Sequence, residues 1–275
     1  MVTSATVQSG CVSNIWRYPV KSMIGEELDA VSVTERGLLG DRAFALVDNE
    51  SGRIVSAKNP RKWADLFAFR ASLPGMTDQS GPLPAAQITF PDGSRATSAQ
   101  PDIDERLSKQ LDRPVRLSAS APPAARAEGY WPDYNWLEQP GETFEFDLPP
   151  GTFFDGATIH FVTTATLDRL KALAPTSRFD VARFRPNLVI DCAGISDQFI
   201  ENDWIGRTLL VGSHVRLQVS RPTFRCVMTT LPQGDLPKDP GVLRTAVQNN
   251  AGNVGAYATV IHGGTIKRGD AVTVK

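Results

Sequence analysis

Short stretches in which apolar and polar positions alternate dominate the first hundred residues, which is the pattern of half-buried strands. Residues 28–33 alternate in this way, and the apolar-rich segment 11–18 ends at a proline. Two further pairs of stretches flank short runs of turn-forming residues and therefore predict hairpins. These pairs are 42–47 with 53–57, and 87–90 with 94–97.

Helical spacing is confined to a few short segments. Ile103, Leu107 and Leu111 recur at every fourth position, and Asp102 stands where an N-cap is expected. A second amphipathic helix is predicted over residues 164–173, before a proline at position 175, and a third, shorter one over residues 242–247.

The second half of the chain otherwise predicts strands, at residues 158–162, 187–191, 208–211, 215–219, 256–261 and 271–274. The fold class is therefore mainly β with helices (α+β). We predict a β-rich domain over residues 1–117, a linker or loop over 118–150 and a barrel-like domain over 151–275. The linker holds an acidic, aromatic segment around Trp131, which either covers a pocket or forms a surface loop held by its own rings.

Composition narrows the classes of partner. The 275 residues are 41% hydrophobic and 21% charged, with a formal net charge of −1. The near-neutral charge argues against nucleic-acid binding as a bulk property. No apolar run approaches the roughly 20 residues of a membrane-spanning helix, and the first residues do not resemble a signal peptide. We therefore expect a cytoplasmic protein with no membrane partner.

The cysteines and histidines do not form a recognisable metal-binding pattern. Cys11, Cys192 and Cys226 contain no C-x-x-C pair, and the three histidines show no H-x-x-x-H spacing. A disulfide framework and a zinc site are thus unsupported. The sequence also lacks the glycine-rich fingerprints of nucleotide binding and the G-x-S-x-G turn of serine hydrolases.

Cys226 is the strongest candidate for chemistry. It follows Arg225 and precedes Val227-Met228-Thr229-Thr230. A thiolate beside positive charge is a plausible soft ligand for a metal, although most free cysteines are small buried apolar residues. On a continuing strand, the Arg225 side chain would lie on the face opposite Cys226.

Several segments supply groups that bind anions. Lys21 and Ser22 stand in Tyr18-Pro19-Val20-Lys21-Ser22, and Arg185 stands in Arg183-Phe184-Arg185-Pro186-Asn187. Arginine forms bidentate bonds with phosphate and lysine acts as a point charge. Thr163 and Thr164 precede a predicted helix, whose N-terminus is a further candidate anion site. One soft ligand and several anion holders suit a cofactor with a metal at one end and a phosphate at the other.

Five motifs in one order resemble the MOSC family and the N-terminal β-barrel domain that usually precedes the MOSC domain. The pattern is most similar to bacterial members akin to the mitochondrial amidoxime-reducing component. Each motif is weak alone, but five in register make a specific signal. They are Tyr18 to Ser22, Gly37-Leu38-Leu39-Gly40-Asp41-Arg42-Ala43-Phe44, Arg183 to Ile190, Arg225 to Thr230, and Gly264-Thr265-Ile266-Lys267-Arg268-Gly269-Asp270.

The resemblance implies a molybdenum cofactor, that is, molybdopterin carrying molybdenum. Cys226 would ligate the metal and act as the catalytic residue. The pterin and its phosphate would be held by Lys21, Ser22, Arg42 and Arg185. Asp155-Gly156-Ala157 aligns with a loop that touches the cofactor in relatives, although Gly156 and Ala157 offer only backbone groups here.

The resemblance also implies an enzyme, an oxidoreductase that reduces N-hydroxylated small molecules by oxygen-atom transfer at molybdenum. Some relatives append an iron–sulfur domain, but this sequence has no such cysteine cluster, so we expect electrons from a separate electron-transfer protein. Trp131, Asp239 and Asn249 are weaker candidates for the substrate side. Two alternatives stay open: a sulfur carrier or cofactor-handling protein with a persulfide on Cys226, and a scaffold that binds another anion.

Overall fold

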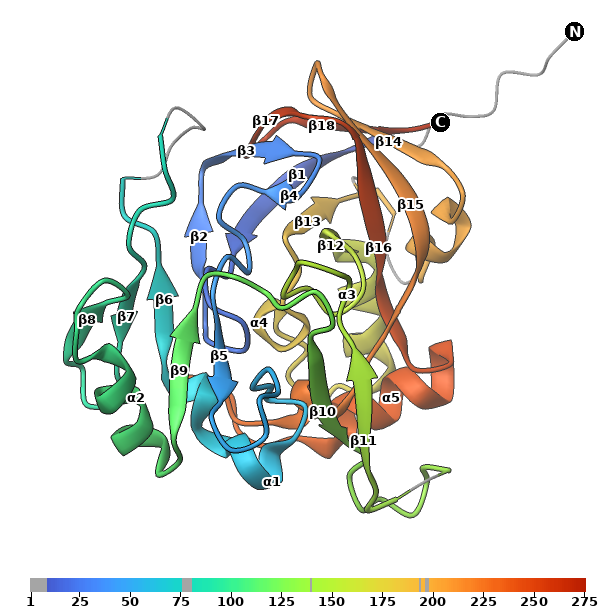
Figure 1. Cartoon of the computed structure of the whole chain (residues 1–275). Coiled ribbons are helices and arrows are strands. Elements are labelled where there is room, and N and C mark those ends of the chain that lie inside the picture. Colours follow the sequence, from blue (N-terminus) through green and yellow to red (C-terminus); the bar gives the residue numbers. More distant parts are fainter. Residues whose placement is uncertain (1–8, 76–80, 139, 193, 196–197) are drawn as a thin grey trace, which may run out of the picture.

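The computed structural model describes residues 9–75, 81–138, 140–192, 194–195 and 198–275, and in these residues seven strands close a β-barrel (Figure 1). The order around the barrel is β13-β12-β16-β15-β14-β18-β1, and β1 pairs with β13 to close it. All neighbours are antiparallel except β12 and β13. The predicted α+β class is confirmed. The strands are β1 (Ser9–Arg17), β12 (Ile159–Thr163), β13 (Leu188–Asp191), β14 (Thr208–Val211), β15 (Val215–Phe224), β16 (Asn253–His262) and β18 (Ala271–Val274).

Alternating side chains fill the barrel. Along the first half of β15, Val215, Leu217 and Val219 are buried while their neighbours are more exposed, as period-two strands require. These residues pack in one cluster with Ile15 of β1 and Phe161 of β12. The cluster places strands from both ends of the chain around a single apolar core.

Strand pairing crosses the boundaries that we predicted between domains. The barrel takes β1 from the N-terminal part, and β2 (Glu26–Leu28) extends the sheet from β1. In the opposite direction, β17 (Gly264–Lys267) pairs with β3 (Ala30–Thr34), which pairs with β4 (Gly37–Leu38). The two halves are therefore interleaved by backbone hydrogen bonds.

The remaining N-terminal residues form small sheets around a second apolar core. The predicted hairpin of β7 (Gln87–Thr89) and β8 (Arg95–Thr97) is confirmed, with β6 (Arg70–Ser72) beside it. The other predicted hairpin differs, because β5 (Ala45–Asp48) forms its ladder with β9 (Val115–Ser118). Residues 53–57 reach β5 only through the bridge between Val47 and Ile54 and flanking backbone bonds.

Five helices have α geometry in the described residues: α1 (Pro60–Trp63), α2 (Ile103–Leu111), α3 (Thr164–Leu173), α4 (Val181–Phe184) and α5 (Pro240–Asn250). Short 3-10 turns cover Ala64–Ala68, Ile200–Trp204 and Val227–Thr230. Asp102 occupies the N-cap position of α2 but its side chain makes no capping bond, so that detail of the prediction was wrong. Within the described residues, no helix combines the length and apolar character that crossing a membrane requires.

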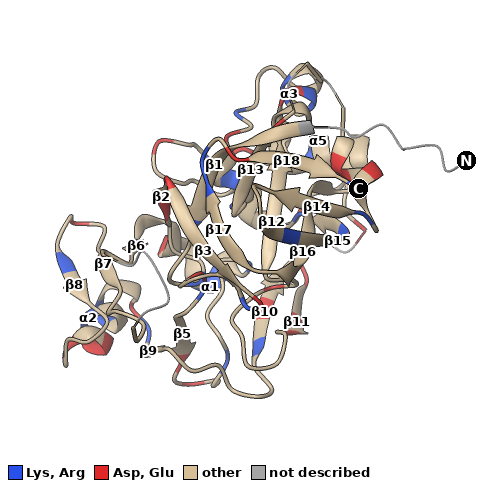
Figure 2. Cartoon of the chain, turned by 90° about the horizontal axis from the view of Figure 1, so that it is seen from above, with Lys and Arg blue, Asp and Glu red and all other residues tan. Residues whose placement is uncertain are grey.

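The predicted linker contains a hairpin of β10 (Arg126–Tyr130) and β11 (Thr143–Asp147). A bridge between Ala127 and Ile54 ties this hairpin to the N-terminal part. In Figure 1 the hairpin lies below the barrel, beside α5. Figure 2 shows basic and acidic positions interspersed along the elements rather than separated by sign.

Candidate functional site

A cavity of about 250 Å³ opens between the N-terminal sheets, the β10–β11 hairpin and the end of β15. Its described lining includes six cations, from lysine and arginine, and a single carboxylate, that of Asp155. Such an imbalance favours an anionic ligand. Most of the predicted site residues line this cavity, namely Lys21, Ser22, Arg42, Ala157, Arg185 and Cys226, together with Trp131.

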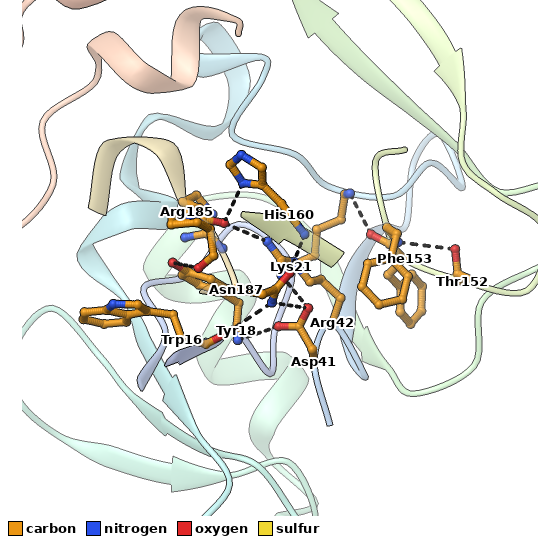
Figure 3. Close-up of polar contacts among 12 residues, drawn as sticks. Trp16, Tyr18, Lys21, Asp41, Arg42, Thr152, Phe153, His160, Arg185 and Asn187 are labelled. Carbon is orange, nitrogen blue, oxygen red and sulfur yellow. Dashed lines mark hydrogen bonds and ion pairs between the residues drawn. The ribbon is translucent and has the colours of Figure 1, made fainter. Parts of the chain in front are cut away.

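Lys21 lies on the wall of the cavity with only 5% of its side chain exposed. Its Nζ donates a hydrogen bond of 2.8 Å to the backbone oxygen of Phe153 (Figure 3). The same Nζ forms an ion pair with Asp155. Burial lowers the pKa of Lys21 to about 8, although the Asp155 carboxylate acts in the opposite direction. The amine is therefore charged at neutral pH, but its charge is poorly solvated and available to an incoming anion.

Asp155 also binds a second lysine. The Lys58 Nζ lies 3.2 Å from Asp155 Oδ2, on the other oxygen from the one that Lys21 contacts. The two amines hold the pKa of Asp155 well below its usual range despite its burial. One carboxylate thus bridges two cations, which is the arrangement that a bound phosphate oxygen would also satisfy.

Arg42 is fixed by its neighbour in sequence and by an aromatic ring. Its guanidinium forms an ion pair with Asp41, and its Cζ lies 4.5 Å from the ring centroid of Tyr18. Asp41 is buried and also accepts hydrogen bonds from the Tyr18 backbone N–H (2.8 Å) and from Nδ2 of Asn187 (3.0 Å). Asp41 therefore joins three of the motifs in one network (Figure 3).

Arg185 ends the short helix α4 and lies on the same tyrosine. Its Cζ is 4.2 Å from the Tyr18 ring centroid, and its NH1 donates to the backbone oxygen of Met23 at 2.7 Å. Burial lowers the pKa of Arg185 to about 10, so the guanidinium stays charged at neutral pH. Among the described residues this guanidinium has one hydrogen-bond acceptor, the Met23 backbone oxygen, so its other N–H groups have capacity for an anion.

Three of the cavity residues have unfavourable backbone geometry. Ser22, Arg42 and Arg185 have φ of 65°, 47° and 53°, in the left-handed region that non-glycine residues avoid. Arg185 also precedes Pro186, and a residue before proline prefers extended backbone. Only two other described non-glycine residues share this geometry, Asp112 and Ala251. Such strain is often retained where it positions a functional group.

Cys226 lies two residues after the end of β15, at the N-cap of a 3-10 turn. Its side chain is partly buried and lines the cavity. Two of the cations, Lys58 and Arg225, line the same cavity as the thiol.

The predicted position of Arg225 was wrong. Its side chain lines the same cavity as Cys226, because the strand ends at Phe224 and the backbone turns. Its NH2 donates to the Phe184 backbone oxygen at 2.7 Å, whereas its buried Nε has no hydrogen-bond partner among the described residues. A buried donor without an acceptor is unfavourable, so an anionic ligand here would satisfy it.

Gly156 lies at the edge of the cavity against two side chains. A Cβ at this position would lie 2.5 Å from NH2 of Arg221 and 3.2 Å from the Tyr257 ring. The absence of a side chain therefore allows Arg221 and Tyr257, whose own cation–ring distance is 5.0 Å, to approach this loop. Neighbouring Ala157 lines the cavity itself.

Thr163 and Thr164 are not part of this cavity. The Thr163 backbone N–H donates to the buried carboxylate of Glu201 at 2.6 Å, and the same carboxylate accepts from the Thr166 hydroxyl. The N-terminus of α3 thus already holds an anion, supplied by the chain itself. Burial raises the pKa of Glu201. Thr164 donates its hydroxyl hydrogen to Asp191 instead.

Asp239 and Asn249 are likewise outside the cavity lining. Asp239 caps α5 by accepting a hydrogen bond from the Gly241 N–H, and Asn249 donates to the Thr245 backbone oxygen. Both side chains have local roles in one helix.

Arg183 has a structural position at the bottom of the cavity. Its NH1 donates to the backbone oxygens of Thr229 (3.1 Å) and Leu231 (3.3 Å), its NH2 to that of Pro237 (2.8 Å) and its Nε to that of Arg178 (2.9 Å). This side chain therefore fixes the loop that follows Cys226.

Sequence reasoning missed Lys58 and His160, which both line the cavity. His160 Nδ1 and Nε2 each lie 3.4 Å from a backbone oxygen, those of Arg185 and Val254. Burial, assisted by Arg225, lowers the pKa of His160 well below its usual value, so the ring is neutral. Lys58 stands in no motif, and no local signal reveals it.

The described part of the chain does not by itself offer a multidentate metal site. No group of three or more His, Cys, Asp and Glu side chains suitable for a metal occurs among the described residues. A metal at Cys226 would thus need to bring most of its own ligands, and the surrounding cations suit a group with a soft metal end and an anionic end. The donor set fits a metal bound to a phosphorylated organic ligand.

Two family models match the chain. The MOSC N-terminal beta barrel domain matches residues 9–97, and the MOSC domain matches residues 150–273. This chain belongs to the MOSC family. The family is associated with the molybdenum cofactor, and in this MOSC protein both matched regions contribute residues to the cavity.

Similar solved structures are distant. The YUAD protein from Bacillus subtilis aligns over 98% of this MOSC chain and 97% of its own, at 12% identity and a TM-score of 0.49. YiiM from Geobacillus stearothermophilus aligns over 43% of this chain and 54% of its own, at 20% identity and a TM-score of 0.32. YiiM from Escherichia coli aligns over the same shares at 18% identity and a TM-score of 0.32. No curated protein sequence gives a match.

Proposed function

We propose that this MOSC protein binds the molybdenum cofactor in the cavity and reduces N-hydroxylated small molecules. The observation that carries the proposal is the convergence of one free thiol and six cations, from distant parts of the chain, on a cavity whose described lining has a single carboxylate. Cys226 would be the protein ligand of the metal. When bound, the cofactor would supply oxygen-atom transfer at molybdenum.

The cations would bind the other parts of the cofactor. Lys21 and Lys58, which share Asp155, would hold the phosphate after exchanging that carboxylate for phosphate oxygens. Arg42 and Arg185 would orient the pterin side through their planar guanidinium groups. The unpartnered Nε of Arg225 would donate to an anionic group beside the sulfur.

Substrate reduction also needs a source of electrons. We propose a separate electron-transfer protein as the donor, and a low-potential chemical reductant can replace it in an assay. Under this proposal His160 remains neutral in the cavity wall, because burial and the nearby Arg225 lower its pKa and outweigh the two backbone oxygens that its ring nitrogens face.

Elemental analysis tests the proposal. Protein made in a host that synthesises the cofactor should contain about one molybdenum per chain, and Cys226→Ser should lose it. Cys11→Ser is the matched control, because Cys11 is also a partly buried free cysteine but does not line the cavity. Cyanide-releasable sulfur without metal would instead favour a persulfide carrier, and neither metal nor sulfur would leave an anion-binding scaffold.

A further inference from the structure

Three aromatic side chains, Trp131, Phe144 and Phe224, lie together in the lining of the cavity, and we refer to them as the aromatic rim. The ring centroids of Trp131 and Phe144 are 5.2 Å apart, and those of Trp131 and Phe224 are 6.1 Å apart with the planes at 70°. Two of the three rings come from the β10–β11 region and the third ends β15. The rim therefore combines segments that are about 90 residues apart in sequence. It is formed by the tertiary fold and not by one local turn.

Glycines fix two of these rings. Phe144 lies opposite Gly129 in the β10–β11 register, and a Cβ on Gly129 would come within 2.3 Å of the Phe144 ring. A Cβ on Gly252 would come within 2.5 Å of the Phe224 ring, and Gly252 has a φ of 78° that favours glycine. Both rings thus pack directly against glycine backbone, which fixes their positions at the cavity independently of a ligand.

Phe224 is held in place although half of it faces solvent. Its relative exposure is 51%, which places it among the few exposed large apolar side chains in the described part of the chain. An apolar ring that is fixed at a cavity and left in water gains free energy when a ligand covers it. Phe224 stands two residues before Cys226 in sequence, and both side chains line the cavity.

We infer that the aromatic rim determines substrate specificity, and that it selects a planar aromatic or heteroaromatic group beside the reacting nitrogen–oxygen bond. The inference rests on the proposed function. Flat rings bind aromatic side chains in offset or edge-to-face arrangements, which the tilted rim planes provide.

A matched pair of substrates tests the inference in the molybdenum-loaded protein. Benzamidoxime carries an aromatic ring and acetamidoxime a methyl group, while both have the same reacting group. Phe224→Ala and Trp131→Ala should each raise KM for benzamidoxime about fivefold to tenfold, the effect of one ring contact. KM for acetamidoxime should stay within about twofold, since it makes no such contact.

Two further variants separate the rim from general damage. Phe224→Tyr keeps the ring and should keep the preference for benzamidoxime. Ile261→Ala removes another exposed apolar side chain, 55% exposed and outside the cavity lining, and should change neither KM. Equal effects of Phe224→Ala on both substrates, or no effect on either, would overturn the inference.

A binding measurement without turnover distinguishes failure of the rim inference from failure of the proposed function. Calorimetric titration of benzamidoxime, with no reductant present, should show affinity that falls about fivefold to tenfold in Phe224→Ala. Protein that lacks molybdenum but shows this ring-dependent binding would overturn the proposed function and leave the rim as a binding surface. Molybdenum-containing, active protein with no dependence on Phe224 would overturn the rim inference alone.

Discussion

Replacing Lys21 by methionine separates a binding role from a structural one. Methionine has a similar length but carries no charge, and Lys21 is 5% exposed. Its pKa falls from 10.5 to about 8 on folding, so keeping the amine charged in the folded protein costs about 3 kcal/mol at pH 7. Lys21→Met removes this cost but leaves the Phe153 backbone oxygen without its hydrogen bond, which offsets about 1–3 kcal/mol.

The expected net result at pH 7 is therefore a ligand-free protein that is unchanged or more stable by up to about 2 kcal/mol, together with loss of molybdenum retention. Urea denaturation of cofactor-free protein measures the first quantity and elemental analysis the second. A loss of more than about 3 kcal/mol would refute the reasoning, because that is the signature of a buried structural ion pair.

The pH dependence of the stability of the same variant tests the direction of the Lys21 pKa shift. The folded-state pKa of Lys21 lies below its unfolded value, so between about 8 and 10.5 the unfolded chain binds more protons. Wild-type stability therefore gains from this group as pH rises through that window, and the variant lacks the gain. The difference in unfolding free energy between variant and wild type should shift by about 2 kcal/mol in favour of wild type from pH 7 to pH 9.5.

Four other substitutions or treatments have defined outcomes. Asp41→Ala should destabilise the protein by about 3–5 kcal/mol in urea denaturation, because it removes the ion-pair partner of the Arg42 guanidinium, the acceptor of the Tyr18 N–H and one acceptor of Asn187 Nδ2. Asp147→Ala, which removes an 84% exposed partner of Arg126, should cost less than about 1 kcal/mol. Glu201→Ala should lower stability by about 2 kcal/mol, since the buried Thr163 N–H loses its acceptor; a change below about 0.5 kcal/mol would contradict that account. In the cofactor-free protein, iodoacetamide should modify Cys226 well before Cys192, whose pKa burial raises to about 12, and peptide mass spectrometry would contradict this if the two reacted at equal rates.

The strand content and much of the cavity could be predicted from the sequence because they depend on local patterns. Alternating positions marked β15 and β16, and short motifs marked Lys21, Arg42 and Arg185, which the structure brings to one cavity. Motif order alone could not place Lys58, since its position depends on the long-range pairing with Asp155.

The errors have identifiable physical causes. The Arg225 side chain was predicted to lie opposite Cys226 by assuming that the strand continues through both residues. The strand instead ends at Phe224, one residue before Arg225, and the backbone turns there. Thr163 matched the pattern of an anion site at a helix N-terminus, but Glu201, which follows 38 residues later, occupies it. In both cases a distant or terminating element overrides the local rule.

The pairing of β1 between β13 and β18 constrains the order in which this protein can fold. Because β1 is synthesised long before β18, their pairing encloses most of the described residues in one large loop closure. A fragment that begins at residue 150 would present two bare strand edges, a surface prone to aggregation. A circular permutant that joins β18 directly to β1 would make these neighbours sequential and should fold faster.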